Sequence, residues 1–399
     1  MLALDRIYHA AYVLKGVARK TDLIAAPHLV SGMEDLYLKT ENLQVTGSFK
    51  LRGASYKISQ LPKGDLERGI IACSAGNHAQ GVALAATRMG VRSIVCMPDG
   101  APIMKVESTR RLGAEVRLVK GSYDDAHDEA VRLQEKTGAT LIHPYDDEDV
   151  ICGQGTIGLE IMDQLEGVDA VVVPVGGGGL ISGVACAVKS LKPSCQVFGV
   201  QAAGASAMAE SFCRGDWYAS DTASTFADGI AVKNPGEITF QMVRKYVDDI
   251  VTVSDDEIAA AILNLMERQK VVAEGAGAVP VAAAMFDKLP LAGKRVVCVV
   301  SGGNIDVNIL SRVINRGLAM SGRKVTMEIR LTDKPGQLQQ VSTIIAELGA
   351  NVVSVDYDLS DPDLPISSCT LRVGMETRDQ AQIDQIRAKL VGEGFALVG

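Results

Sequence analysis

Lys50 lies in a short segment whose residue types can position a reactive amine. Gly47 permits a tight turn and Ser48 is a favoured N-cap residue, so Lys50 is predicted to lie in the first turn of a helix. The N-terminus of a helix is electropositive, and a buried Lys50 there would tend toward the neutral, nucleophilic amine. The alternative is a solvated surface lysine, which is the more common case and which only the other parts of a site can exclude.

A run of glycines after the apolar segment 170–175 is predicted to bind a phosphate. The run, which we call the glycine loop, comprises Gly176, Gly177, Gly178, Gly179 and Leu180. Without Cβ atoms its backbone can close around an anion, and the start of the next helix adds positive potential. A merely flexible loop is the alternative, but four glycines between a buried strand and a helix carry a large conformational cost.

The phosphate is not expected to belong to a nucleotide. A dinucleotide site needs G-x-G-x-x-G, and that spacing arrives here at Ile181 or Ser182. The following strand ends in Val200 and Gln201 rather than in an acid for a ribose. The glycine loop also lacks the Gly-Lys-Ser/Thr of a Walker loop.

Two further turns follow strands and carry neutral polar side chains. In residues 74–81 the backbone amides are predicted to hold a second anion, such as a substrate carboxylate, and Asn77 offers its amide to a ring hydroxyl. The residues expected at the substrate are Ser74, Ala75, Gly76, Asn77 and His78. Ordinary helix capping is the alternative, and a lone histidine is more often structural. The other turn, residues 301–304, reads Ser-Gly-Gly-Asn.

These parts do not suit a hydrolase. The chain lacks G-x-S-x-G and H-E-x-x-H, and the acidic run 146–149 is expected to be a solvated helix start. A lysine, two anion sites and neutral polar turns match a phosphorylated aldehyde that forms a Schiff base, which is pyridoxal 5'-phosphate.

Composition narrows the remaining classes. With 399 residues, 47% of them hydrophobic, two domains are expected. A net charge of -8 and scattered basic residues argue against a nucleic-acid partner. The eight cysteines form no C-x-x-C pair and are expected to be buried thiols in a reducing cytoplasm. Neither a signal sequence nor a membrane span is recognised, so a cytoplasmic protein without a membrane partner is predicted.

The pattern of the chain predicts a doubly wound α/β fold followed by a small domain. Continuously apolar strands, typical of covered parallel sheets, alternate with helical segments. They are predicted at 69–73, 93–97, 115–119, 170–175, 196–200 and 295–300. After Arg323 the order βαββαβ predicts a ferredoxin-like domain, with strands at 325–331, 351–357 and 367–374 and a loop rich in Asp and Pro. We expect domains at 1–322, with a subdomain near 45–145, and at 323–399.

Five motifs carry a family resemblance. They are residues 48–53, 74–81, 153–156, 176–180 and 301–304. Their order and spacing resemble fold type II pyridoxal phosphate enzymes, which share the tryptophan synthase β-like fold. Over residues 1–320 the chain is most similar to the threonine ammonia-lyases, also called threonine dehydratases. The remainder, with Asp-Lys-Pro-Gly-Gln-Leu, resembles an ACT domain, a regulatory module that binds amino acids.

The resemblance assigns roles to individual residues. It implies that Lys50 is joined to the cofactor, that Phe49 packs by the ring and that Asn77 bonds the ring hydroxyl. The glycine loop would hold the phosphate. Ser301 would face the pyridine nitrogen, where a hydroxyl leaves the ring a weaker electron sink and so favours elimination at Cβ.

The resemblance also implies an activity. L-threonine would give 2-oxobutanoate and ammonia, and L-serine would give pyruvate. Serine dehydratase, serine racemase and an inactive amino-acid sensor are the alternatives. Serine racemases carry a second serine where this chain has Ala75, so racemisation is not expected. Gln201, Ala205 and Ala207 stand where some relatives bind a divalent ion, so no metal is expected.

For the small domain, the resemblance implies a regulatory site. An amino-acid effector, for example isoleucine or valine, is expected near Gly336, Gln337, Leu338 and Asn351, between two such domains of a homodimer or homotetramer. A structural or dimerisation role is the alternative.

Overall fold

The computed structural model describes residues 3–359 and 365–398. Two compact units divide between Ile305 and Asp306, and each is described here by itself. Helix α13 (Val307–Met320) therefore belongs to the second unit, whereas the predicted boundary fell after residue 322. Within the described residues no helix has both the length and the apolar character needed to cross a membrane.

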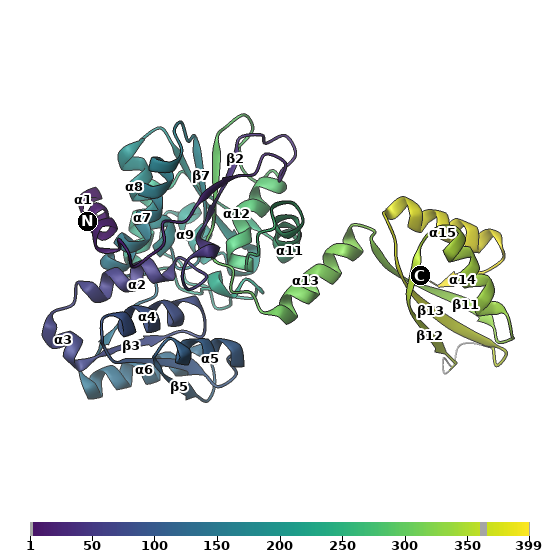
Figure 1. The fold of residues 1–399 in the computed structure, drawn as a ribbon, viewed down its shortest axis with the longest axis horizontal. Coiled ribbons are helices and arrows are strands. Elements are labelled where there is room, and N and C mark those ends of the chain that lie inside the picture. Colours follow the sequence, from purple (N-terminus) through teal and green to yellow (C-terminus); the bar gives the residue numbers. More distant parts are fainter. Residues whose placement is uncertain (1–2, 360–364, 399) are drawn as a thin grey trace. The chain divides into compact units, whose positions relative to one another are not determined.

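The first unit contains a large, mainly parallel sheet in the order β1-β2-β10-β7-β8-β9, with only β1 antiparallel. Figure 1 labels two of its strands, β2 and β7. Its strands are β1 (Leu23–Ala25), β2 (Leu36–Thr40), β7 (Ala170–Pro174), β8 (Gln196–Ala202), β9 (Asp249–Val253) and β10 (Val296–Val300). Helix α12 (Gly275–Met285) packs on four of these strands. Other helices pack with alternate valines of β7 and β10 in one apolar core. They are α7 (Glu148–Gln164), α8 (Gly179–Leu191), α9 (Ala207–Arg214) and α10 (Glu237–Tyr246).

A second, fully parallel sheet forms the smaller lobe of this unit, in the order β5-β4-β3-β6. Its strands are β3 (Ile70–Cys73), β4 (Ser93–Pro98), β5 (Glu115–Val119) and β6 (Thr140–Leu141). The helices between residues 50 and 137 are α2 (Lys50–Ser59), α3 (Lys63–Arg68), α4 (Asn77–Arg88), α5 (Ile103–Arg111) and α6 (Tyr123–Thr137). The doubly wound α/β prediction is confirmed. Each of the six predicted strands of the first unit is found, while β1, β2, β6 and β9 were missed.

Glycines bring α7 close to its neighbours. A Cβ on Gly153 would lie 2.6 Å from the carbonyl oxygen of Arg52, and one on Gly183 would lie 2.5 Å from the backbone nitrogen of Gly155. Gln154 Oε1 accepts a hydrogen bond from the Gly53 N–H at 3.2 Å. The motif at 153–156 therefore lets α7 pack closely against α8 and against α2, the helix that carries Lys50.

The first unit also contains helices α1 (Leu4–Val13) and α11 (Asp255–Asn264).

The second unit contains the predicted ferredoxin-like domain. Its elements after α13 are β11 (Lys324–Thr332), α14 (Gln337–Glu347), β12 (Asn351–Asp358), β13 (Ser368–Glu376), α15 (Gln380–Gly392) and β14 (Ala396–Val398). The sheet is antiparallel in the order β12-β13-β11-β14, and both helices contribute to one apolar core with it. The middle of the predicted Asp- and Pro-rich loop, residues 360–364, lies outside the described residues.

Candidate active site

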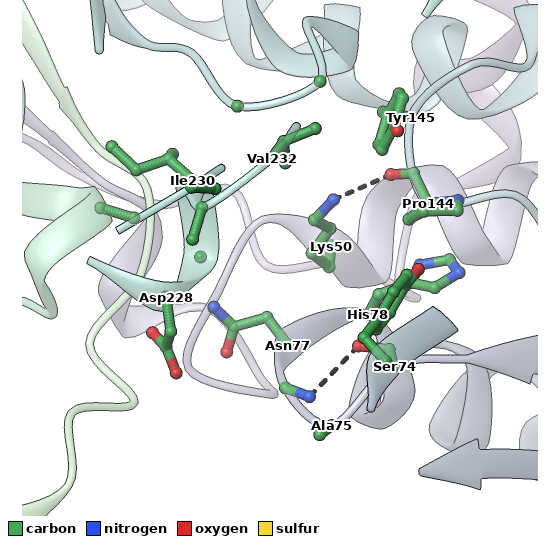
Figure 2. A pocket seen from close by; sticks show the side chains of 18 of the residues that line it. Lys50, Ser74, Ala75, Asn77, His78, Pro144, Tyr145, Asp228, Ile230 and Val232 are labelled. Atoms are coloured by element: carbon green, nitrogen blue, oxygen red, sulfur yellow. Dashed lines mark hydrogen bonds between the residues drawn. The ribbon is translucent and has the colours of Figure 1, made fainter. Parts of the chain in front are cut away.

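The carboxyl ends of three parallel strands surround one cavity of about 520 Å³. The turns that follow β3, β7 and β10 line it together with Lys50. Figure 2 shows Lys50 with Ser74, Ala75 and Asn77 from the turn after β3. Every residue predicted at the cofactor or substrate is part of this lining. They are Phe49, Lys50, Ser74, Ala75, Gly76, Asn77, His78, Gly176, Gly177, Gly178, Gly179, Leu180 and Ser301. The structure thus brings the separate motifs to one place, while their individual roles stay predictions.

Helix α2 begins at Lys50, but the predicted cap is wrong. Its N-cap is Phe49 rather than Ser48. Ser48 instead forms an antiparallel bridge with Gly302, and the Phe49 N–H donates to the Ser301 carbonyl at 3.1 Å. Gly47 makes the turn that sequence predicted, with φ of 71°. The segment before the helix is thus fixed by the turn after β10, which no local propensity reveals.

Lys50 is half-buried, and its amine lies inside the cavity. Burial lowers its pKa from 10.5 to about 8, although the charge of Glu274 opposes this shift. Nζ donates to the Pro144 carbonyl at 2.8 Å, as Figure 2 shows, and lies 5.2 Å from the centre of the Phe49 ring. A larger share of neutral amine is therefore present near neutral pH than in an exposed lysine.

Tyr145 explains why the loop after β7 needs glycine. A Cβ on Gly177 would lie 2.4 Å from the Tyr145 ring, and one on Gly179 would lie 2.9 Å from its Cα. Gly178 is the N-cap of α8 with φ of 96°, a conformation that favours glycine. The Tyr145 hydroxyl donates to the Asn234 carbonyl at 3.0 Å. The glycine loop therefore presents the N–H groups of the first turn of α8 to the cavity, where an anion can bind.

A chain of hydrogen bonds includes two residues of the cavity lining, Asn77 and Glu274. The Asn304 amide donates to the Thr46 carbonyl at 2.8 Å and to Asn77 Oδ1 at 2.7 Å. Asn77 Nδ2 donates to Glu274 Oε1 at 2.7 Å. These bonds join segments that lie 197 to 258 residues apart in sequence.

Glu274 is a site residue that the sequence reasoning missed. It is 4% exposed and is the N-cap of α12. Burial raises its pKa to about 7, and the charge of Asp228 adds to this effect, while Asn77, Lys105 and Lys50 oppose it. The available signal was an acid immediately before a wholly apolar helix, a position that leaves the carboxylate little solvent. Lys105 and Asp228 form an ion pair and also line the cavity.

His78 has a structural side chain. Its Nε2 lies 2.9 Å from the Ile142 carbonyl oxygen, so this nitrogen carries the hydrogen and donates it. Burial lowers the pKa of His78 to about 3, with Lys50 contributing to the shift. The imidazole is thus neutral, and its Nε2 hydrogen is already engaged by the Ile142 carbonyl. In the same turn, Ser74 Oγ accepts the Gly76 N–H at 3.1 Å (Figure 2).

Two expectations about charged and thiol groups are corrected. The acidic run 146–149 is not simply solvated, because Asp146 accepts the N–H groups of Glu237 and Thr239 at the start of α10, both at 3.1 Å. Asp147 caps α7. The eight cysteines all lie in the described part of the chain and form no disulfide, but Cys213 is exposed.

The other predicted residues lie outside the cavity. Gln201 Oε1 accepts the Ala209 N–H at 2.7 Å, which engages this side chain in the fold. Among the described residues, no cluster of three His, Cys, Asp or Glu side chains could hold a metal ion. In the second unit, Gly336 is the N-cap of α14, whereas Asn351 follows the other end of that 11-residue helix. One copy therefore does not bring the two together.

Comparison with known proteins identifies the family. The model of the family described as pyridoxal-phosphate dependent enzyme matches residues 14–302. The L-threonine ammonia-lyase of Thermotoga maritima is 51% identical over 397 residues, which cover 99% of this chain and 98% of that protein.

Two solved structures are similar to most of the chain. The processed form of threonine deaminase isoform 2 from Solanum lycopersicum has a TM-score of 0.73 at 39% identity, covering 78% of this chain and 93% of that one. Maize serine racemase has a TM-score of 0.74 at 34% identity, covering 80% and 98%. The chain therefore belongs to the family of pyridoxal-phosphate dependent enzymes, of fold type II, and its similarity to a threonine ammonia-lyase extends over its whole length.

Proposed function

We propose that this enzyme deaminates L-threonine to 2-oxobutanoate and ammonia, and that it also converts L-serine to pyruvate. The observation that carries the proposal is the Lys50 amine, with its pKa lowered to about 8, in the same cavity as the glycine loop. The name of the Thermotoga maritima relative supports threonine as the substrate.

The residues of the cavity fit pyridoxal phosphate. The backbone N–H groups at the start of α8 suit the phosphate, because the N-terminus of a helix binds anions. Glycine is required in this loop because a Cβ on Gly177 or Gly179 would collide with Tyr145. Lys50 supplies the amine for the aldehyde. Asn77 uses one side-chain hydrogen for Glu274 and retains a second for the ring hydroxyl. Ser301, buried at the end of β10, is suited to face the pyridine nitrogen.

Each group in the cavity has a separate role in the proposed reaction. When bound, pyridoxal phosphate supplies an electron sink for the bond between Cα and its hydrogen. The first turn of α4 binds the substrate carboxylate through its N–H groups. Nζ of Lys50, whose pKa is lowered to about 8, takes the Cα proton when it is in its neutral form. Loss of the β-hydroxyl as water and hydrolysis at Cα give the 2-oxo acid and ammonia, with no net consumption of water. Ala75 offers no hydroxyl as a second acid, so racemisation is not expected.

Turnover on three amino acids tests this function. We expect 2-oxobutanoate from L-threonine, pyruvate from L-serine, and no D-serine from L-serine. Borohydride reduction followed by mass spectrometry should place a pyridoxyl group on the peptide that contains Lys50. If the group is on Lys50 and threonine is not consumed, the substrate assignment is wrong; if the group is elsewhere or absent, the catalytic assignment is wrong. D-serine would favour the serine racemase alternative.

We further propose that the second unit is an ACT domain that binds an amino-acid effector. The sheet order β12-β13-β11-β14 and the turn at Gly336, with φ of 93°, support this assignment. Gly336 and Asn351 lie beyond opposite ends of α14 within one copy, which favours a site shared by two copies and hence a homodimer or homotetramer. Eight cysteines without a disulfide among them are consistent with the proposed cytoplasmic location.

Comparison of the full chain with a chain ending at Ile305 tests this regulatory role. Isoleucine and valine are each added to threonine assays of both proteins. We expect an effector to change kcat or KM of the full chain, while the shortened chain retains turnover and loses the response. A shortened chain that binds pyridoxal phosphate but lacks turnover would contradict a purely regulatory role.

A further inference from the structure

The orientation of the Asn77 amide is determined by its partners. The Thr46 carbonyl can only accept, so Asn304 must turn its NH₂ group toward both Thr46 and Asn77. Asn77 must then present Oδ1 to Asn304, and its NH₂ group points to Glu274. Asn77 is therefore a pure donor toward the cavity, and any ring oxygen that it contacts must accept.

The carboxyl group of Glu274 has little freedom to move. A Cβ on Gly302 would lie 2.3 Å from Glu274 Oε1, and one on Gly229 would lie 3.4 Å from it. The Glu274 N–H donates to the Gly302 carbonyl at 3.1 Å. Backbone from two different segments thus encloses the carboxyl group, and its position relative to Asn77 is built into the fold.

The charged groups around Glu274 come from three elements. Lys50 lies on α2, Lys105 on α5, and Asp228 in the short 3-10 turn Asp228–Ile230. Lys105 and Asp228 form an ion pair, and Asp228 has the larger effect of the two on Glu274, whose pKa it raises. The charges of Glu274 and Lys50 also act on each other: Lys50 lowers the pKa of Glu274, and Glu274 raises the pKa of Lys50.

We propose that Glu274 is a positioning residue of the active site, which aims Asn77 at the ring oxygen of the cofactor and sets the charge that this oxygen and Lys50 experience. The proposal rests on the proposed function, because it requires the cofactor ring beside Asn77. An N–H donor from Asn77 favours an anionic ring oxygen. When Glu274 is neutral, the preference for an anionic ring oxygen is unchanged. When Glu274 is ionised, its negative charge disfavours an anionic ring oxygen and favours the protonated form of Lys50. The cofactor environment should therefore change as Glu274 titrates, near pH 7.

Glu274→Gln tests this, because glutamine can still accept from Asn77 but does not titrate. Glu34→Gln, at an exposed carboxylate, is the matched control. All proteins are loaded with pyridoxal phosphate, and the visible absorbance of the bound cofactor is followed from pH 5.5 to 8.5, values chosen to bracket the pKa of about 7. We expect wild type and Glu34→Gln to titrate near pH 7 and Glu274→Gln to lose that transition. A transition that persists in Glu274→Gln overturns the proposal.

Glu274→Leu supplies a second measurement. It removes the acceptor of Asn77, and we expect the Kd for pyridoxal phosphate to rise about 10- to 100-fold, the effect of losing a hydrogen bond to a charged group. Unchanged affinity would show that Glu274 does not position Asn77. Borohydride trapping on wild type separates the two hypotheses: no pyridoxyl group on Lys50 refutes the proposed function itself, whereas a labelled Lys50 with an unaltered titration in Glu274→Gln refutes only the role of Glu274.

Discussion

Lys50→Ala is expected to lower kcat for L-threonine by at least about 10,000-fold, because it removes the amine that we propose both joins the cofactor and acts as the base at Cα. The substitution leaves the glycine loop and its phosphate site in place. The variant should therefore bind pyridoxal phosphate reversibly but show no pyridoxyl group after borohydride reduction. Steady-state kinetics and mass spectrometry measure both effects. Residual turnover above one hundredth of wild type, by protein free of wild-type contamination, would assign the base to another residue.

Lys63→Ala is the matched control, since Lys63 is exposed and lies on α3 of the same lobe. It should retain wild-type kinetics and the pyridoxyl group on Lys50.

The stability of the cofactor-free proteins shows whether Lys50→Ala loses activity through its chemistry or through unfolding. Burial lowers the pKa of Lys50 from 10.5 to about 8, so the folded state holds its proton less tightly than the unfolded state. Below pH 8 the charged lysine destabilises the fold fully, and this penalty disappears as pH rises through 8 toward 10.5.

Lys50→Ala should therefore not unfold the cofactor-free protein at neutral pH. The removed penalty, about 3 kcal/mol from the shift between 10.5 and about 8, offsets the small loss of aliphatic packing. Urea unfolding of both proteins at pH 7 and near pH 10.5 measures the difference. The variant should lose stability relative to wild type between the two values. A constant difference would show that the lysine is not destabilising when charged.

Features that depend on local sequence were predicted well. Glycine loops that end apolar strands are local patterns, and the carboxyl ends of parallel strands meet at one edge of a sheet. The lining of one cavity by residues 49–50, 74–78, 176–180 and Ser301 follows from those two facts. The small domain was predictable for a similar reason, because β11 alternates exposed and buried positions as a half-covered strand does.

Features that depend on distant partners were not predictable from local pattern. Ser48 has a favoured capping side chain, yet its backbone pairs with Gly302, and the helix begins without it. Glu274 and Asn77 lie 197 positions apart, and neither sequence neighbourhood indicates the other. Strand β2 was missed in part because it contains Lys39, a residue type rarely buried, which is fully buried here against Glu160. Such side chains are tolerated inside the fold because the tertiary structure supplies a partner of opposite charge.

Arg52→Ala is expected to destabilise the protein by about 3–5 kcal/mol, because it leaves buried carboxylates without their cation. Arg52 is 1% exposed and Glu41 is 0% exposed. The guanidinium donates to both Glu41 oxygens, at 2.9 and 2.8 Å, and to Glu160 Oε1 at 2.6 Å. Burial alone would raise the pKa of Glu41, yet the charge and hydrogen bonds of Arg52 bring it below the usual value. Glu41 therefore depends on Arg52 to remain ionised.

Arg92→Ala is the control for this effect, since Arg92 also pairs with a carboxylate, Glu115, but both side chains are more than half exposed. Its loss should change the free energy of unfolding by less than about 1 kcal/mol. Urea unfolding at pH 7 compares the two variants with wild type. Because Arg52 lies on α2 only two positions after Lys50, loss of its ion pairs should also displace the Lys50 amine, and turnover should fall in protein that is still folded. If Arg52→Ala changes the free energy of unfolding no more than Arg92→Ala does, the buried ion pairs do not stabilise the helix that carries Lys50.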